Sequence, residues 1–146
     1  NNVVASTEVK SFEHLICTEQ LSRRLGFKVG EELIRVVRVR SLNGNARQVD
    51  HGYFLESIAK GLTPEIAAKS IYDYLEHKRG VKVMASRRTV SVELANDEDC
   101  SYLDLGKYNC VAVMESQSYT SDGILFEVTH ARTHPEIFHY RVNSKR

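Results

Sequence analysis

The chain has 146 residues, 42% of them hydrophobic, and a formal net charge of +1 at pH 7, which fits one globular domain with its own core and excludes a disordered tail or a fibrous repeat. The near-neutral charge leaves no overall field to attract nucleic acid or anionic lipid. No apolar run is long enough to span a bilayer, and the start of the chain lacks a signal-peptide pattern.

Residues 1–10 are predicted to be a tether that leads into an extended segment up to residue 16. The chain begins without Met, which suggests that it is a piece of a longer protein. Thr18 is then the expected N-cap of a short helix, and Gly26 is its expected C′ residue.

Alternating side chains predict a strand over residues 32–40, on which Arg38 and Arg40 point to the same face. The Asn-Gly pair at 43–44 is a strong signal for a tight hairpin, so the next segment should return as an antiparallel neighbour. In that pairing Asp50 is expected to lie near one of the two arginines. Two guanidinium groups on one strand face form the first candidate feature for binding an anion.

A helix is predicted from Ser70, its N-cap, to Gly80. Its buried side is expected to carry Ile71, Tyr74 and Leu75. The first turn offers unpaired N–H groups, a partial positive charge and a hydroxyl, which together suit an anion. The alternative interpretation is that Ser70 only caps the helix.

The second half of the chain is predicted to contain four strands and one helix. The strands are expected at 81–94, 110–119, 124–132 and 137–142, and the helix is expected to begin after Asn96 as its cap. A change of phase within the first of these strands predicts a bulge near Arg87 and Arg88. This order of hairpins and helices indicates a single α+β domain, built on a mostly antiparallel sheet with flanking helices.

Four stretches of the sequence carry a resemblance to a known family. They are Arg38-Val-Arg40 before the Asn-Gly turn, Ser70-Ile-Tyr72 at a helix start, the acid-rich start at Asn96, and Ser121-Asp-Gly-Ile-Leu-Phe-Glu127 with Arg132. In order and spacing they resemble the UTRA domain, the C-terminal effector-binding half of bacterial GntR-type regulators of the HutC subfamily. The resemblance runs from about Ser11 to Tyr140, and the domain is expected to occupy residues 11–146.

Within this family, three stretches are most similar to repressors of trehalose operons: Val49–Phe54, Ser70–Glu76 and His130–His134. The resemblance implies a chorismate-lyase-like fold that senses a ligand rather than catalysing a reaction, in a cytoplasmic homodimer without a cofactor. It also implies a winged helix-turn-helix, outside this chain, that holds DNA. The implied effector is a small phosphorylated sugar, with trehalose 6-phosphate as the first candidate.

The resemblance places the effector site on Arg38, Arg40, Ser70, Tyr72 and Glu127, with Asp50 and Arg132 as further candidates. Physical chemistry agrees, because arginine forks and a helix N-terminus suit a phosphate, while carboxylates and a tyrosine suit a sugar ring. Sugar-phosphate binders of this family often carry Tyr where Thr133 stands here. The contacts to the ring are therefore left open.

Two alternatives to a sensor stay open from the sequence alone. Arg38 and Arg40 are also explained by structural ion pairs with Asp50 or Glu127, in a dimerisation module without a ligand. Glu127 is also a candidate acid or base for an enzyme on the related lyase fold, although no second catalytic group or activated nucleophile is recognisable.

A metal site is not expected, because His130, His134 and His139 lie on a strand and a turn and do not converge as a helical pair would. The three cysteines form an odd number without a close pair. This pattern indicates reduced thiols in a cytosolic setting.

Overall fold

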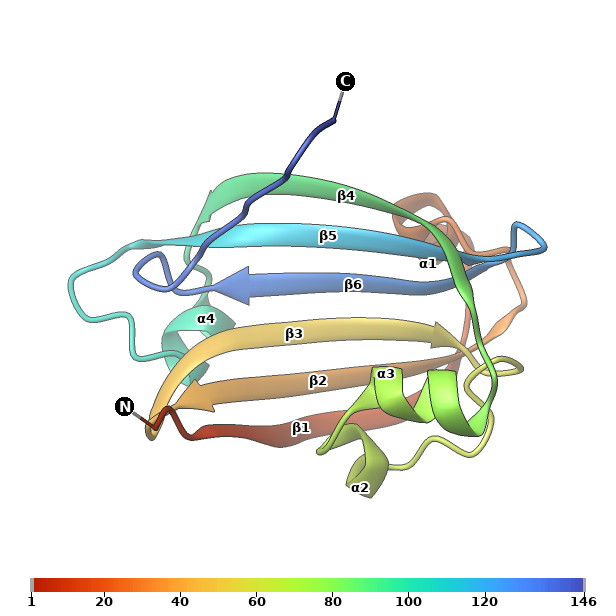
Figure 1. Ribbon diagram of the computed structural model, residues 1–146, viewed down its shortest axis with the longest axis horizontal. Helices are drawn as coiled ribbons and strands as arrows, with labels where there is room; N and C mark the ends of the chain where they lie inside the picture. The colour runs from red at the N-terminus through yellow and green to blue at the C-terminus, as the bar shows by residue number, and fades with distance from the viewer. Residues whose placement is uncertain (1, 146) are drawn as a thin grey trace.

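Six strands form one antiparallel sheet in the order β1-β2-β3-β6-β5-β4 in the computed structural model, which describes residues 2–145 (Figure 1). The strands are β1 (Ala5–Ile16), β2 (Glu32–Leu42), β3 (Asn45–Leu55), β4 (Val83–Leu94), β5 (Cys110–Thr120) and β6 (Leu125–Thr133). The helices are α1 (Glu19–Leu25), α2 (Pro64–Ala67), α3 (Ile71–Asp73), the π-helical turn η1 (Tyr74–Lys78) and α4 (Asp97–Tyr102). The predicted α+β class with a mostly antiparallel sheet is confirmed.

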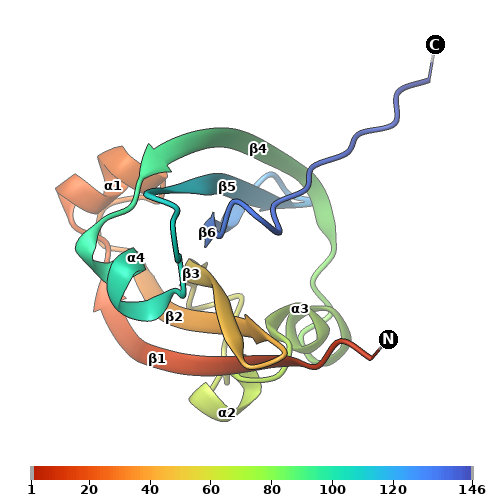
Figure 2. The same cartoon turned by 90° about the vertical axis from the view of Figure 1, so that its left-hand side faces the viewer.

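Short helices flank both faces of the sheet. Figure 2 looks along the strands and shows α1 and α4 on one side and α3 on the other. One core beneath α4 joins three valines of β2 and β3 to Leu103 and Leu105. A larger core contains the fully buried rings of Phe27, Phe54 and Phe126. Among residues 2–145, no helix combines the length and the apolar character that crossing a membrane would need.

Several local signals of the sequence form the predicted structures. The Thr18 hydroxyl caps α1 by accepting from the Leu21 N–H at 3.2 Å. The hairpin between β2 and β3 turns through Asn43 and Gly44, whose φ values of 51° and 81° are those of the tight turn that Asn-Gly favours. The cap of α4 at Asn96 is a reciprocal capping box.

The N-terminal tether predicted for residues 1–10 is wrong for most of its length. The segment from Ala5 belongs to β1, which pairs along β2 from Ala5 opposite Leu42 to Ile16 opposite Glu32. Its polar side chains are largely exposed, because β1 is an edge strand. The segment forms a strand because its backbone pairs with β2, not because it has an apolar pattern of its own.

Two predictions for the second half need correction. The bulge in β4 lies at Met84, where the register with β5 shifts, whereas Arg87 and Arg88 pair regularly with Gln117 and Ser116. The strand predicted for residues 137–142 is absent, and the segment has no regular structure within this chain. Its pattern is that of a strand, but it has no partner strand among residues 2–145.

The helix predicted from Ser70 to Gly80 begins as expected but is not a regular α-helix. After α3 it widens into η1, in which the Arg79 N–H donates to the Tyr74 carbonyl at 3.1 Å, five residues back. Ile71 and Leu75 are buried as predicted, and Tyr74 is partly buried. A π-helical turn of this kind is often found beside a functional site.

Candidate functional site

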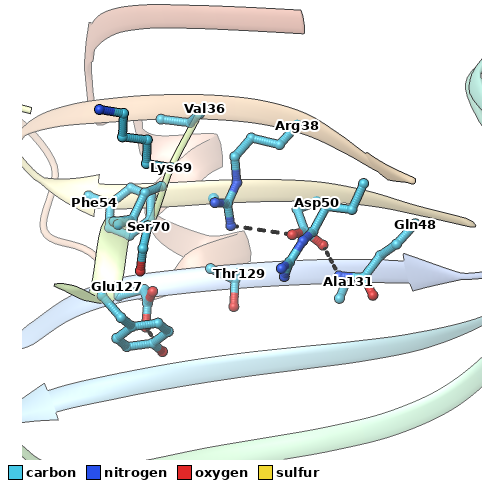
Figure 3. A pocket seen from close by; sticks show the side chains of 14 residues that line it. Val36, Arg38, Gln48, Asp50, Phe54, Lys69, Ser70, Glu127, Thr129 and Ala131 are labelled. Carbon is cyan, nitrogen blue, oxygen red and sulfur yellow. Dashed lines mark hydrogen bonds and ion pairs between the residues drawn. The ribbon is translucent and has the colours of Figure 1, made fainter. Parts of the chain in front are cut away.

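The candidate site is a cavity of about 260 Å³ between the sheet and the start of α3. It is lined by Val36, Arg38, Arg40, Gln48, Asp50, Gly52, Phe54, Lys69, Ser70, Ile71, Tyr72, Glu127, Thr129 and Ala131. Six of the seven residues predicted for the site are therefore brought together. In Figure 3 the side chains of Arg38, Ser70, Glu127 and Thr129 point towards one common space.

Arg38 lies at the centre of the polar wall and is already partly neutralised. It stands directly opposite Asp50 across the β2–β3 ladder, and its Nη2 lies 3.3 Å from the Asp50 carboxylate. Its Nη1 donates to the carbonyl of Ala67 at 3.3 Å. Burial lowers the pKa of Arg38, and the Asp50 carboxylate opposes that shift. The paired acid was predicted correctly from the hairpin register.

Asp50 is held on its other side by a short chain of polar side chains. The Gln48 amide donates to Asp50, and the Thr133 hydroxyl donates to the Gln48 side-chain oxygen at 3.2 Å. Thr133 is thus buried behind the polar wall rather than part of the cavity lining. This chain fixes the carboxylate that orients Arg38.

Arg40 supplies positive charge at the cavity, whereas Lys69 lines the rim and its ammonium points away from Arg38 and Ser70 (Figure 3). Arg40 follows Arg38 on the same face of β2 and is exposed at the cavity. Within residues 2–145, neither Arg40 nor Lys69 has a carboxylate partner in an ion pair. The positive charge of Arg40 contributes to the lowered pKa of Arg38. An anion in the cavity would relieve this repulsion.

Ser70 places a hydroxyl at the cavity and also caps α3. Its Oγ accepts from the Asp73 N–H at 3.2 Å, which confirms the predicted N-cap. The hydroxyl proton stays available to an acceptor in the cavity. Both interpretations made from the sequence, a cap and a site residue, are geometrically compatible.

Glu127 and Tyr72 form the opposite wall. The Tyr72 hydroxyl donates to the Glu127 carboxylate at 2.7 Å. Burial raises the pKa of Glu127, which is only 2% exposed, while Tyr72 and Ser118 hydrogen bonds oppose the shift. Burial and the neighbouring Glu127 charge also raise the pKa of Tyr72. The wall therefore offers a carboxyl group and a phenol to the hydroxyls of a ligand.

Arg132 does not belong to this cavity, contrary to the prediction. It lies on the reverse face of β6, where its Nε donates to Asp99 at 2.9 Å and its Nη1 donates to Glu93 at 2.9 Å. The physical reason is the alternation of the strand, which turns Glu127 and Thr129 to one face and Arg132 to the other. Arg132 instead anchors α4 to the sheet through fully buried Asp99.

Several lining residues were missed although the same alternation locates them. Counting in steps of two from Asp50 gives Gln48 and Gly52, and counting from Glu127 gives Thr129. Lys69 carried no periodic signal, because it lies in the irregular connection before α3.

The histidines of the C-terminal third are separated in space. His130 lies on the reverse face of β6, 3.3 Å from the Glu115 carboxylate, and His134 packs edge-on against Tyr108. In the part of the chain that the structure describes, no three His, Cys, Asp or Glu side chains are placed to hold a metal ion.

This chain is similar to known proteins in both sequence and fold. The HTH-type transcriptional regulator TreR of Bacillus subtilis (strain 168) is 28% identical over 123 residues, which cover 84% of this chain and 52% of that protein. The repressor NagR of the same organism is 23% identical over 116 residues, covering 80% of this chain and 47% of that protein. The chain thus spans about half the length of these curated relatives.

The solved structure of the effector-binding domain of the B. subtilis trehalose repressor (TreR) has a TM-score of 0.89 at 27% identity, covering 97% of this chain and 98% of that one. This likeness confirms the expected chorismate-lyase-like fold. The relatives are named as transcriptional regulators, which agrees with a sensing rather than a catalytic domain. The UTRA domain model matches residues 1–139, from ten residues before the expected start, and the chain therefore belongs to the UTRA domain family.

Proposed function

We propose that this chain is the effector-binding domain of a GntR-type transcriptional repressor, and that its pocket binds a small phosphorylated sugar. The observation that carries this proposal is the shared cavity, which is lined by Arg38, Arg40 and Ser70 together. The opposite wall holds Glu127 and Tyr72. A ligand with an anionic end and a hydroxylated end matches these two walls.

The cationic wall suits a phosphate group. Arg38 is partly satisfied by Asp50, whereas Arg40 has no carboxylate partner in an ion pair within residues 2–145. Charge-assisted hydrogen bonds from guanidinium groups to phosphate oxygens are among the strongest in proteins. The Ser70 hydroxyl adds a neutral donor on the same side. We assign the phosphate to the space between these groups.

The second wall suits a sugar ring. Glu127 and the hydroxyl of Thr129 accept or donate hydrogen bonds, and the Tyr72 ring offers an aromatic surface. Tyr72 also lines a neighbouring cavity of about 450 Å³ that contains Leu75, Val81 and Phe126. A disaccharide phosphate could place its second ring there. Trehalose 6-phosphate is for this reason our first candidate, and the trehalose repressor named above supports that choice.

The rest of the regulator is also part of the proposal. The chain covers about half of TreR, which is named an HTH-type transcriptional regulator. We therefore place DNA binding in a separate winged helix-turn-helix domain. We further propose that the regulator acts in the cytoplasm as a homodimer. Effector control then requires that the ligand binds one dimer state more tightly than the other.

Isothermal titration calorimetry on the domain tests the proposal. Trehalose 6-phosphate, glucosamine 6-phosphate and N-acetylglucosamine 6-phosphate are titrated beside trehalose and inorganic phosphate. We expect one phosphosugar to bind, and a hundredfold excess over its Kd to stabilise the fold by about 2.7 kcal/mol. Arg40→Ala should lose at least about tenfold in affinity.

Arg23→Ala is the matched control, because Arg23 carries the same charge on α1, on the reverse side of the sheet (Figure 2). Equal binding by Arg40→Ala and Arg23→Ala would refute the assigned phosphate site. The Arg38–Asp50 ion pair also favours a second candidate function, a dimerisation module whose arginines are structural. Absence of binding and thermal stabilisation with every phosphosugar would favour this second function.

A further inference from the structure

The edge strand β4 presents an apolar surface to solvent. All 12 of its residues are exposed, and Val90, Val92 and Leu94 are exposed by 42%, 73% and 75%. The outer side of β4 has no hydrogen-bonded neighbour strand in the sheet formed by residues 2–145. A bare apolar edge is a template for another strand, and natural proteins usually cover such an edge. This surface therefore calls for a strand from outside the sheet.

The apolar side chains of β4 lie on the same face of the sheet as the effector pocket. Val90 pairs with Met114 on β5, and Met114 pairs with Ala131 of the pocket lining on β6. In Figure 1 this half of the face is crossed by the C-terminal part of the chain, while α3 lies in front of the other half.

The C-terminal tail, residues 137–145, has a strand-like sequence but forms no strand. Ile137, Tyr140 and Val142 are exposed by 38%, 47% and 65%. Figure 1 shows the tail passing in front of β5 and β4 and leading away from the body. It crosses β4 rather than running beside it, because the tail follows β6, and β5 separates β6 from β4. The tail thus has the pattern of a strand but no partner strand among residues 2–145.

We propose that the tail of one copy adds as a strand to the outer edge of β4 in a second copy, and that the exchange is reciprocal. This inference rests on the homodimer of the proposed function and assigns its interface. Strand addition would satisfy the unpaired backbone groups of both segments. A reciprocal exchange forms a closed, two-fold assembly in which each copy both gives and receives a tail.

The spacing of apolar residues in the two segments is the same. Every second residue is apolar from 138 to 142 in the tail and from 90 to 94 in β4. When the three apolar residues of each segment face one another, the middle pair is Tyr140 beside Val92 in both parallel and antiparallel directions. The pairing therefore predicts one specific contact without requiring a choice of direction.

The interface would adjoin the effector pocket. Ala131 lines the pocket, and its ladder neighbour Met114 lies beside Val90 of the proposed interface. A ligand that shifts β6 would thus also shift β5 and β4, because Ala131, Met114 and Val90 are neighbours on three adjacent strands. This arrangement gives the effector a short structural route to the geometry of the dimer.

Disulfide trapping between two different chains tests the contact. Cys100→Ser and Cys110→Ser remove the accessible thiols, while Cys17 is buried and stays. One preparation then carries Val92→Cys and a second carries Tyr140→Cys. Mixed under mild oxidation, the two should form an inter-chain disulfide that neither preparation forms alone. The matched control replaces Tyr140→Cys by Arg141→Cys, one residue out of phase, and should link much less.

Analytical ultracentrifugation keeps the two hypotheses apart. Val92→Asp should weaken the dimer at least about tenfold, and its effector affinity reports the pocket separately. If the unmodified domain is dimeric but the Val92 and Tyr140 cysteines do not link, the assigned surface is wrong and the dimer stands. A domain that stays monomeric at high concentration would overturn both the proposed interface and the homodimer. If the cysteines link but no phosphosugar binds, the interface is supported and only the proposed ligand is wrong.

Discussion

The hydroxyl of Tyr72 donates to the carboxylate of Glu127 at 2.7 Å, which joins a side chain 52% exposed at the pocket to one only 2% exposed. The bond links α3 to β6 through two residues that are 55 positions apart in the chain. A ligand hydroxyl that reaches Glu127 would bind the same carboxylate that accepts from Tyr72. The pair therefore couples occupancy of the pocket to the position of α3.

The protonation of Glu127 should make stability depend on pH. Burial raises its pKa above that of the unfolded chain, so the folded protein keeps a proton that the unfolded chain releases. The contribution of Glu127 to stability is complete below the unfolded pKa, near 4.5, and falls as pH rises towards the higher folded value. Glu127→Gln should flatten this part of the curve and be more stable than wild type at pH 8.

Urea denaturation from pH 4 to pH 8 measures this effect. Asp122→Asn is the control, because Asp122 is exposed in the hairpin between β5 and β6. A pH dependence that is the same in Glu127→Gln and in wild type would contradict the assignment.

Arg38 should contribute to both stability and ligand binding, and a double variant separates the two. Arg38→Ala leaves the Asp50 carboxylate, only 10% exposed, without its cation, and we expect a loss of about 3 kcal/mol. Arg38→Met combined with Asp50→Leu removes both charges and should regain most of that stability. It should still fail to bind a phosphosugar in calorimetry. Binding by the double variant would show that Arg38 is structural only.

Arg132 is expected to be a purely structural residue. Arg132→Ala removes the partner of Asp99, which is fully buried, and should cost about 3 kcal/mol of unfolding free energy. Effector affinity of the folded variant should stay within about twofold of wild type, because Arg132 lies on the reverse face. Chemical denaturation measures the stability of the variant, and calorimetry on the same sample measures its effector affinity. A loss of affinity without a loss of stability would show that Arg132 belongs to the effector site.

Gly52 keeps part of the pocket open. A Cβ at this position would lie 2.7 Å from the ring of Phe54, which also lines the cavity. Gly52→Ala should therefore displace the ring, cost about 1–3 kcal/mol and reduce effector affinity. Ala131→Gly is the comparison variant, because it changes the same cavity by removing a methyl group. Gly44→Ala is not suitable, because the φ of Gly44 is positive and would strain any other residue. An unchanged affinity in Gly52→Ala would show that the ligand avoids this side.

Ser70 should affect stability less than binding. Ser70→Ala removes the cap on the Asp73 N–H and should cost about 1 kcal/mol. Ser70→Asn keeps a capping acceptor but changes the donor offered to the pocket. If the hydroxyl contacts phosphate, both variants should weaken binding in calorimetry although only Ser70→Ala loses the cap.

The parts of the fold that the sequence predicted are those with local causes. The turn at Asn43 and Gly44 sets the register that brings Asp50 to Arg38, and the caps at Thr18 and Asn96 begin their helices. Each of these depends on residues a few positions apart. The hairpin register and the alternation of side chains placed Arg38, Arg40 and Asp50 on one face without knowledge of the strand order in the sheet.

The errors arose where distant parts of the chain decide. Ala5 joins a strand because β2 lies beside it, whereas the tail has no neighbouring strand in the part of the chain that the structure describes. Arg132 was a different kind of error, since counting in steps of two from Glu127 already puts it on the reverse face. The widened turn after Asp73 has no recognisable sequence signal.

The widened turn η1 makes the length of this segment as important as its composition. In η1 the backbone bond from Arg79 spans five residues instead of four. Deleting one residue between Glu76 and Lys78 would let the segment close as an ordinary α-helix. Everything before the deletion would then rotate by about 100° relative to Gly80, carrying the phenol of Tyr72 away from β6. Relatives in which this helical segment is one residue shorter must therefore build the adjoining pocket wall from a different side chain.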